Sequence, residues 1–217
     1  MTSMVSDGIR LIRSSTGRRR VLEGIRVRLY WRRDAVGLRR DVSVPFAAPP
    51  AKIPVTVRRL RPDDDLAFIA EDPDLPPQEA AERDSRRELL RADIPTCWIA
   101  VDSEGTGCYM QWLIEARDNA RIQAFWPGLF PELKPGEALL EAAYTGDGHR
   151  GKGIMAHAMA LIAEQARDLG VQHVITFVSN DNIASLKGCE RAGFAPYVNR
   201  RESWTLFRPR VRFQPLA

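Results

Sequence analysis

The sequence predicts an α/β fold of the α+β type, in which a central sheet is flanked by helices and preceded by a β-rich N-terminal extension. Two observations predict this fold. Strand-like segments with alternating or continuous apolar residues are interspersed with segments whose apolar residues recur at helical spacing. A glycine-rich turn also joins a strand-like segment at 137–145 to a helix-like segment at 154–169. With 217 residues, 44% of them hydrophobic, the chain can form one well-buried domain with an extension.

Residues 1–54 are predicted to form this basic extension. Apolar and basic residues alternate in 25–32, as in a half-buried strand, and 37–42 is the predicted hairpin partner. Four prolines between 45 and 54 then predict a stiff connector. Residues 1–61 contain 15 basic and 4 acidic side chains, whereas the rest of the chain contains 17 basic and 24 acidic ones. Docking between the halves or a solvated strand face is favoured over nucleic-acid binding, because no aromatic-interleaved motif accompanies the arginines.

Residues 55–217 are predicted to form the main domain, which begins with a short strand at 55–60. The run at 62–65, Pro-Asp-Asp-Asp, predicts a helix start, since acidic residues in a first turn favour the helix dipole. A second helix is predicted at 77–91 because proline suits the first helical turn. Strands at 96–101 and 107–114 follow, joined by a hairpin turn at 102–105.

The second half of this domain begins with an irregular stretch that contains Phe125, Trp126, Leu129 and Phe130. Residues 137–145 have a helix-compatible composition, but a strand is favoured because a glycine-rich turn and a clear helix follow. That helix, 154–169, has an apolar face and ends at a glycine. The remaining predicted elements are a buried strand at 174–178, a helix at 183–192 that a glycine stops, and strands at 197–199 and 203–207.

Composition excludes several classes of protein. No window approaches the roughly 18 consecutive apolar residues of a membrane span, and the N-terminus lacks the layout of a secretory signal. We therefore expect a cytoplasmic protein without membrane contact. The cysteines Cys97, Cys108 and Cys189 show no metal-type spacing, and the three histidines form no metal-binding motif. No bound metal is expected.

The glycine-rich turn at 146–153, Gly-Asp-Gly-His-Arg-Gly-Lys-Gly, predicts an anion site. Glycines allow backbone N–H groups to approach a phosphate, and the start of the following helix is partially positive. The pattern Gly-x-Gly-x-x-Gly matches a dinucleotide fingerprint, but only 64 residues follow Gly153, too few for the further β-α units that this fold needs. A nucleotide P-loop would need Ser or Thr at position 153, where this chain has glycine.

A third alternative fits better. Arg150-Gly151-Lys152-Gly153 followed by a helix resembles the coenzyme A pyrophosphate loop of the GNAT superfamily of N-acetyltransferases, although the family pattern is matched only in part. A second segment, 182–194, resembles a later signature of the same family, in which Asn182 opens a short helix that ends in Gly193-Phe194. Two such motifs at the expected separation are a stronger indication than either alone. The resemblance extends over about residues 55–207.

This resemblance implies a mixed, mostly antiparallel central sheet flanked by helices, with acetyl-CoA as co-substrate. The strand before the loop would donate backbone N–H groups to pantetheine and to the thioester carbonyl. The residues that the resemblance assigns to acetyl-CoA binding are Ala143, Tyr144, Thr145, His149, Arg150, Gly151, Lys152, Gly153, Ile154, Asn182 and Ser185.

The resemblance also implies direct attack of an amine on the thioester, which needs a base and a proton donor for the leaving thiolate. Glu137 and Glu141 lie four residues apart on the predicted strand and therefore share a face. Either carboxylate could be the base, or both could be solvated glutamates. Many family members have Tyr where this chain has Cys189, so the proton donor is open between Cys189, Tyr144, Tyr197 and water.

The predicted function is therefore transfer of an acetyl group to the primary amine of a small molecule. The aromatic residues at 125–130 could line an acceptor or acyl pocket, seal the core or form a homodimer contact. If they line an acyl pocket, the alternative is transfer of a longer acyl chain. Another alternative is a GNAT-fold binding module that contacts nucleic acid or a protein partner through its basic N-terminal segment.

Overall fold

The computed structural model describes residues 30–205 and 208–216. These residues form an eight-stranded sheet with the order β2-β3-β4-β5-β6-β1-β7-β8. The strands are β1 (Tyr30–Asp41), β2 (Val55–Arg59), β3 (Cys97–Asp102), β4 (Gly107–Glu115), β5 (Glu137–Thr145), β6 (His173–Ser179), β7 (Ala195–Thr205) and β8 (Arg208–Pro215). Neighbouring strands are antiparallel except β5 and β6, which are parallel. The predicted mixed, mostly antiparallel fold is confirmed.

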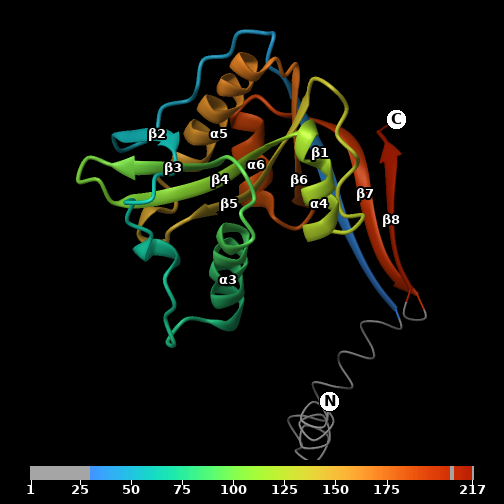
Figure 1. Ribbon diagram of the computed structural model, residues 1–217, viewed down its shortest axis with the longest axis horizontal. Helices are drawn as coiled ribbons and strands as arrows, with labels where there is room; N and C mark the ends of the chain where they lie inside the picture. Colours follow the sequence, from blue (N-terminus) through green and yellow to red (C-terminus); the bar gives the residue numbers. More distant parts are fainter. Residues whose placement is uncertain (1–29, 206–207, 217) are drawn as a thin grey trace, which may run out of the picture.

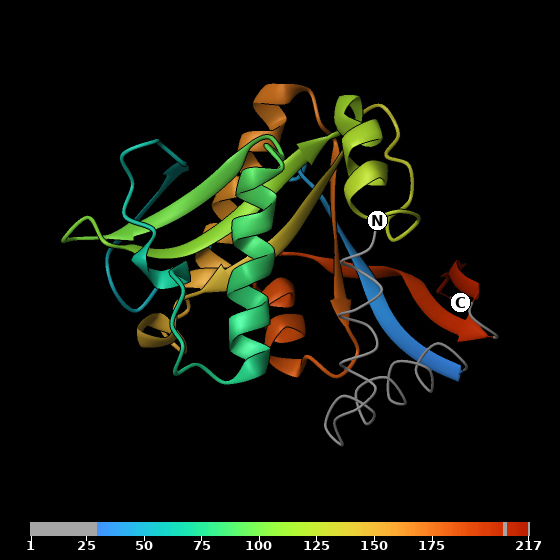
Figure 2. The same ribbon diagram turned by 60° about the horizontal axis from the view of Figure 1, so that its bottom comes forward.

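Helices cover both faces of the sheet (Figures 1 and 2). One face carries the short 3-10 helices η1 (Ala67–Ile69) and η2 (Ala116–Asp118) together with α3 (Pro77–Arg91) and α4 (Asn119–Phe125). The other face carries α5 (Ile154–Gln165), its continuation η4 (Ala166–Leu169), and α6 (Ile183–Arg191). Successive side chains along each strand point to opposite faces of the sheet and contribute to two buried apolar clusters, one beneath each helical layer. Removal of this surface from water is the main stabilising contribution to the fold.

Strand β1 lies inside the sheet, between β6 and β7, although it precedes the predicted main domain in sequence. The hairpin predicted from 25–32 and 37–42 is wrong, because residues 30–41 form one continuous strand. Residues 25–29, and the arginines at positions up to 28, lie outside the described residues. Gly37 lies inside this strand, at a crowded position where an added Cβ would lie 2.4 Å from Val198 and 2.7 Å from Phe177.

Strands β5 and β6 pair only at their first residues, Glu137–Leu139 with His173–Ile175, and part beyond them. On its other edge, β5 contains a β-bulge: Trp112 pairs with Glu141 and Met110 pairs with Tyr144, so β5 has one extra residue. Ala142 in this bulge has a φ of 60°, a left-handed conformation that is uncommon for a residue with a side chain. The bulge therefore lies at the fork between the two parallel strands.

Three other predicted elements differ from the structure. Residues 62–65 start no α-helix, because the Asp64 carboxylate pairs with Arg58 and accepts the backbone N–H of Arg61 at 2.7 Å, which forms a turn instead. Helix α4 was missed within the stretch predicted as irregular. The two predicted tail strands are one strand, β7, and β8 follows it. Charged residues interrupt the apolar pattern of β7, so the sequence suggested two short strands. In the structure the guanidinium of Arg200 packs over the rings of Phe130 and Phe177, and the strand continues through it.

Candidate active site

A groove of about 810 Å³ lies between α3, the end of β5, the glycine-rich turn, the start of α5, and α6. The residues assigned to acetyl-CoA by sequence resemblance line it, with the exception of Lys152: Ala143, Tyr144, Thr145, His149, Arg150, Gly151, Gly153, Ile154, Asn182 and Ser185. The Asn182 side-chain oxygen accepts the backbone N–H of Ser185 at 3.1 Å and so caps α6. Segments far apart in sequence therefore form one continuous cavity.

The glycine-rich turn presents bare backbone to this groove. Gly151 and Gly153 have φ angles of 75° and 76°, which side-chain-bearing residues rarely adopt. A Cβ at Gly151 would meet no atom within 4 Å, so its backbone is open. Gly153 is the N-cap of α5 and has no side chain that could accept the first free N–H groups of the helix. These groups and the positive end of the helix dipole suit an anion, and the turn fits a pyrophosphate.

The connector between β1 and β2 supports the turn from outside. We call residues 49–52 the strap. The strap amide of Lys52 donates to the Lys152 carbonyl at 2.8 Å, and the Pro49 carbonyl lies 2.9 Å from Nδ1 of His157. Pro50 and Lys52 line the groove, whereas Lys152 does not. The N-terminal segment thus contributes one wall of the site, which the local sequence did not indicate.

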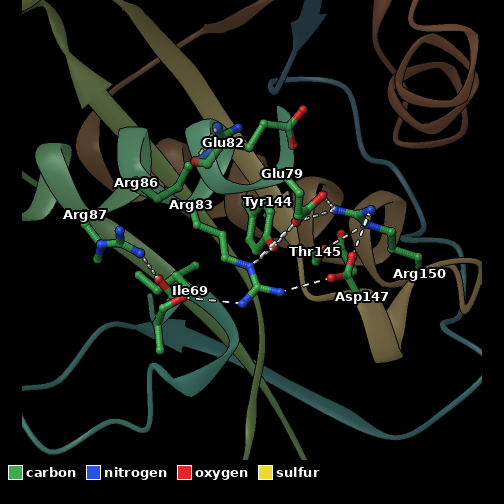
Figure 3. Close-up of polar contacts among 11 residues, drawn as sticks. Ile69, Glu79, Glu82, Arg83, Arg86, Arg87, Tyr144, Thr145, Asp147 and Arg150 are labelled. Atoms are coloured by element: carbon green, nitrogen blue, oxygen red, sulfur yellow. Dashed lines mark hydrogen bonds and ion pairs between the residues drawn. The ribbon is translucent and has the colours of Figure 1, made fainter. Parts of the chain in front are cut away.

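An ion-pair network connects α3 to the turn (Figure 3). The Arg150 guanidinium donates to both carboxylate oxygens of Glu79 and also pairs with Asp147 at 2.9 Å. Arg83 donates to Asp147 and to the Tyr144 hydroxyl, each at 3.0 Å, and that hydroxyl donates to Glu79. Burial favours the protonated form of Glu79, but the hydrogen bonds from Tyr144 and Arg150 outweigh it and leave the pKa of this carboxyl below its usual value.

Arg86, one turn further along α3, contacts the bulge. Its guanidinium donates to the Ala142 carbonyl at 3.3 Å, to the Ala143 carbonyl at 2.9 Å and to the Glu82 carbonyl at 3.0 Å. The same group lies 5.6 Å from the centre of the Tyr144 ring and lines the groove. Burial lowers the pKa of Arg86 from its usual value, but an arginine remains charged in proteins. A fixed positive charge therefore lies at the bulge end of the groove.

Sequence reasoning missed the contribution of α3. Glu79 and Arg83, like Glu82 and Arg86, are four residues apart and thus neighbours on a helix surface. Leu89 is the buried residue of this helix, so most of the side that packs on the sheet is polar. The sequence did offer a signal: the predicted helix at 77–91 has few apolar residues with which to pack on a sheet. This low apolar content indicated that its charged side chains serve a site.

The two predicted base candidates have different surroundings. The Glu141 carboxylate lies at the fork, where it accepts the backbone N–H of Phe177 at 2.6 Å and lies 3.4 Å from the Thr176 hydroxyl. Burial raises the pKa of Glu141 despite these hydrogen bonds. The Glu137 carboxylate instead accepts the Lys134 amide at 2.9 Å, at the closed end of the strand pair. A raised carboxyl pKa near a cleft is typical of a general base.

The predicted proton donors are poorly available. Cys189 is fully buried and its sulfur lies 3.9 Å from that of Met159, while burial raises its pKa to about 12. Tyr144 lines the groove, but its hydroxyl is engaged with Glu79 and Arg83, and burial raises its pKa to about 12. Tyr197 packs against Phe177 outside the groove. None of these three side chains presents a free acidic proton to the groove.

The aromatic residues at 125–130 pack on the sheet. Phe125, Trp126 and Phe130 form edge-to-face pairs, and Phe130 lies 5.6 Å from Phe177 between ring centres. Phe130 is buried in the core cluster on this face, and the others pack against it. This arrangement favours the interpretation that the insert seals the core. It does not line the groove.

Within residues 30–205 and 208–216, no helix is long and apolar enough to cross a bilayer. The same residues contain no cluster of three or more His, Cys, Asp or Glu side chains arranged to hold a metal ion.

The parallel strands β5 and β6 part beside an uncapped, glycine-rich helix start, and this arrangement agrees with the coenzyme A-dependent acyltransferase class that the two sequence motifs resemble. Residues 55–195 match the model of the acetyltransferase (GNAT) domain, and the chain therefore belongs to the GNAT acetyltransferase family. A curated relative, mycothiol acetyltransferase of Salinispora tropica, is 29% identical over 181 residues, which cover 78% of this chain and 52% of the relative. The chain thus spans about half the length of that relative.

Solved structures share the fold. A GCN5-related N-acetyltransferase from Sphaerobacter thermophilus superposes with a TM-score of 0.50 and 19% identity, covering 89% of this chain and 58% of that one. A GNAT-family acetyltransferase from Colwellia psychrerythraea gives a TM-score of 0.50 and 16% identity, covering 85% and 56%. At these identities the likeness concerns the fold alone.

Proposed function

We propose that this chain transfers an acetyl group from acetyl-CoA to the primary amine of a small molecule by direct attack, with Glu141 as general base. One observation carries the proposal: the Glu141 carboxylate lies at the fork of β5 and β6, two residues before Ala143, which lines the same groove as Gly151 and Gly153 of the open turn. Such a groove suits a long, narrow substrate with a pyrophosphate at one end and a reactive group at the other.

The turn would hold the pyrophosphate through the amides at the start of α5 and the charge of Arg150. Acetyl-CoA supplies the activated acetyl group as a thioester. The amine nitrogen attacks its carbonyl carbon, the carbon–sulfur bond breaks, and the electron pair goes to sulfur. Glu141 takes the proton from nitrogen. Its raised pKa makes it a stronger base than an ordinary carboxylate.

Glu141 is a better candidate than Glu137. Glu137 lies where β5 and β6 are still paired, and its carboxylate is used by the turn before β5. Four strand residues span about 13 Å, so the two carboxylates cannot occupy one position. Membership of the acetyltransferase family and the name of the relative, a mycothiol acetyltransferase, support acetyl as the group transferred.

Calorimetric titration with acetyl-CoA tests the donor site. Gly151→Asp places a negative charge and a strained side chain at the open turn, and should abolish binding. Gly128→Asp is the matched control, because Gly128 has a φ of 69°, also meets no atom within 4 Å, and lies outside the groove. Micromolar binding to the wild type and to Gly128→Asp justifies a screen of amines by thiol release. Absence of binding to the wild type would refute the proposal.

A further inference from the structure

The proton donors that the sequence predicted are not available to the leaving thiolate. Cys189 lies in the core, and the Tyr144 hydroxyl already donates to Glu79. A thiolate can also be stabilised as an anion, since a fixed charge in a partly buried site has a stronger effect than in water. Among the cations that line the groove, Arg86 contacts the bulge at the fork.

Arg86 has the required position. It lines the groove together with Ala143, Gly188 and Met155, and its guanidinium contacts the two bulge carbonyls. A guanidinium has five N–H donors in a rigid fork. Three of its hydrogen bonds are to the carbonyls of Ala142, Ala143 and Glu82, which leaves donors for a ligand. These bonds fix the cation in place before any substrate binds.

We propose that Arg86 is a catalytic residue that stabilises the thiolate of coenzyme A as the amine displaces it. The inference rests on the proposed function. As the carbon–sulfur bond breaks, the electron pair moves to sulfur and the amine proton moves to Glu141. The sulfur leaves as an anion beside Arg86, and water protonates it after release. The reaction therefore needs no tyrosine at the position of Cys189.

Charged and titratable groups from three elements surround Arg86. They are Glu79 and Glu82 on its own helix, Glu141 and Tyr144 on β5, and Tyr109 on β4. Tyr109 is fully buried and its hydroxyl donates to Gln111 at 2.5 Å. The carboxylates partly offset the charge of Arg86, and loss of the Glu141 charge by protonation increases its effect on the thiolate.

The test compares the binding of coenzyme A and of desulfo-coenzyme A by calorimetry as a function of pH. A free thiol has a pKa of about 8.5, and a cation within 4–6 Å lowers the pKa of a bound acid by about 1–3 units. If the bound thiol has the lower pKa, binding releases a proton between the two values. The affinity ratio of coenzyme A to desulfo-coenzyme A should then rise about tenfold per pH unit in that window.

Arg86→Met should bind desulfo-coenzyme A like the wild type but lose the rise in this ratio, and its kcat should fall about 100-fold with little change in KM for acetyl-CoA. Arg86→Lys keeps the charge and should retain part of the rise. Arg91→Met, which removes an exposed arginine from the same helix, is the control and should behave as the wild type. Thermal unfolding of each variant checks that it folds.

The outcomes separate the two proposals. A ratio that stays flat in the wild type, while both ligands bind, overturns the role of Arg86 and leaves the donor site intact. A ratio that still rises in Arg86→Met also overturns the proposed role of Arg86. It would mean that another group lowers the pKa of the bound thiol and that Arg86 only supports the bulge. If neither ligand binds the wild type, the proposed function fails, and the role of Arg86 fails with it.

Discussion

One guanidinium nitrogen of Arg150 lies 2.9 Å from one carboxylate oxygen of Glu79 and 2.7 Å from the other. This contact fastens α3 to the turn that is proposed to bind pyrophosphate. The Glu79 side chain is largely buried and lines the groove, so its negative charge lies beside the proposed anion site. Glu79 and a pyrophosphate would compete for the same arginine.

We therefore expect Glu79→Gln to bind acetyl-CoA more tightly. Two unit charges at 4 Å interact by about 1 kcal/mol in water-like surroundings, which corresponds to roughly fivefold in affinity. The gain should shrink at high salt, because Arg150 is half-exposed and its interaction with a bound anion is screened. Calorimetry at low and high salt measures it, with Asp84→Asn as a control on the exposed side of the helix. Weaker binding by Glu79→Gln would mean that Glu79 instead holds Arg150 in its binding position.

A second prediction concerns Arg40, which joins β1 to the helices behind the sheet. Its guanidinium pairs with Glu164 and donates to the Ala160 carbonyl at 3.0 Å, and the side chain is only 2% exposed. Arg40→Ala should lower the free energy of unfolding by about 3–5 kcal/mol, because it leaves a partly buried carboxylate and helix carbonyls without their partner. Urea denaturation measures the change. The neighbouring exposed Arg39→Ala should cost less than about 1 kcal/mol.

Local signals explain which parts of the fold the sequence predicted. Helix α3 begins at Pro77 as expected, and β5 and α5 begin at the expected residues on either side of the glycine-rich turn. In these segments the turn residues, the capping residues and the apolar periodicity all indicate the same element boundaries, and these signals lie within a few residues of one another. The groove-lining positions from Ala143 to Ile154 were assigned by the resemblance to the GNAT family, which depends on the same glycine-rich turn.

Non-local pairing explains what the sequence could not predict. The place of β1 between β6 and β7 depends on partners more than 130 residues away, as in the pairing of Ala35 with Ser179. The contact of Arg86 with the bulge requires α3 to dock on a particular turn of β5. The depth of Cys189 depends on how α6 packs against α5. Such facts arise from tertiary structure, and no local motif reports them.

The third prediction concerns the proposed base. Glu141→Gln should lower kcat by about 10²–10⁴-fold and leave acetyl-CoA binding unchanged, since the amide oxygen can still accept the Phe177 N–H. In the wild type, kcat should fall as the pH drops through the raised pKa of Glu141, above the usual carboxyl value of about 4.3. Steady-state rates across pH measure both effects. Glu137→Gln should keep most of the activity, and an inactive Glu137→Gln would instead identify Glu137 as the base.

The raised pKa of Glu141 also predicts an effect on the stability of the fold. The ionised carboxylate that is proposed to act as the base lowers the free energy of unfolding. Because the folded-state pKa of Glu141 is raised, its contribution to stability is fully present below the unfolded-state pKa and is lost as the pH rises through the folded-state value. Glu141→Gln cannot ionise. It should therefore be more stable than the wild type at neutral pH, and this advantage should disappear in acid. Thermal unfolding across pH checks the sign, and a destabilised variant at pH 7 would contradict it.

The last prediction concerns the strap. Lys52 is exposed, lines the groove, and is fixed by its backbone bond to Lys152 at 2.8 Å. Its ammonium group can therefore reach an anion that binds the turn at 150–153. Lys52→Ala should weaken acetyl-CoA binding by a few-fold, and reversal of the charge in Lys52→Glu should weaken it further, both more strongly at low salt. Lys134 is exposed and lies outside the groove, so Lys134→Ala should have no effect.

If dephospho-coenzyme A loses as much affinity as coenzyme A in Lys52→Ala, the lysine acts on the pyrophosphate. If the loss is confined to coenzyme A, it acts on the 3′-phosphate. Equal affinity of all variants would show that the strap supports the turn through its backbone alone.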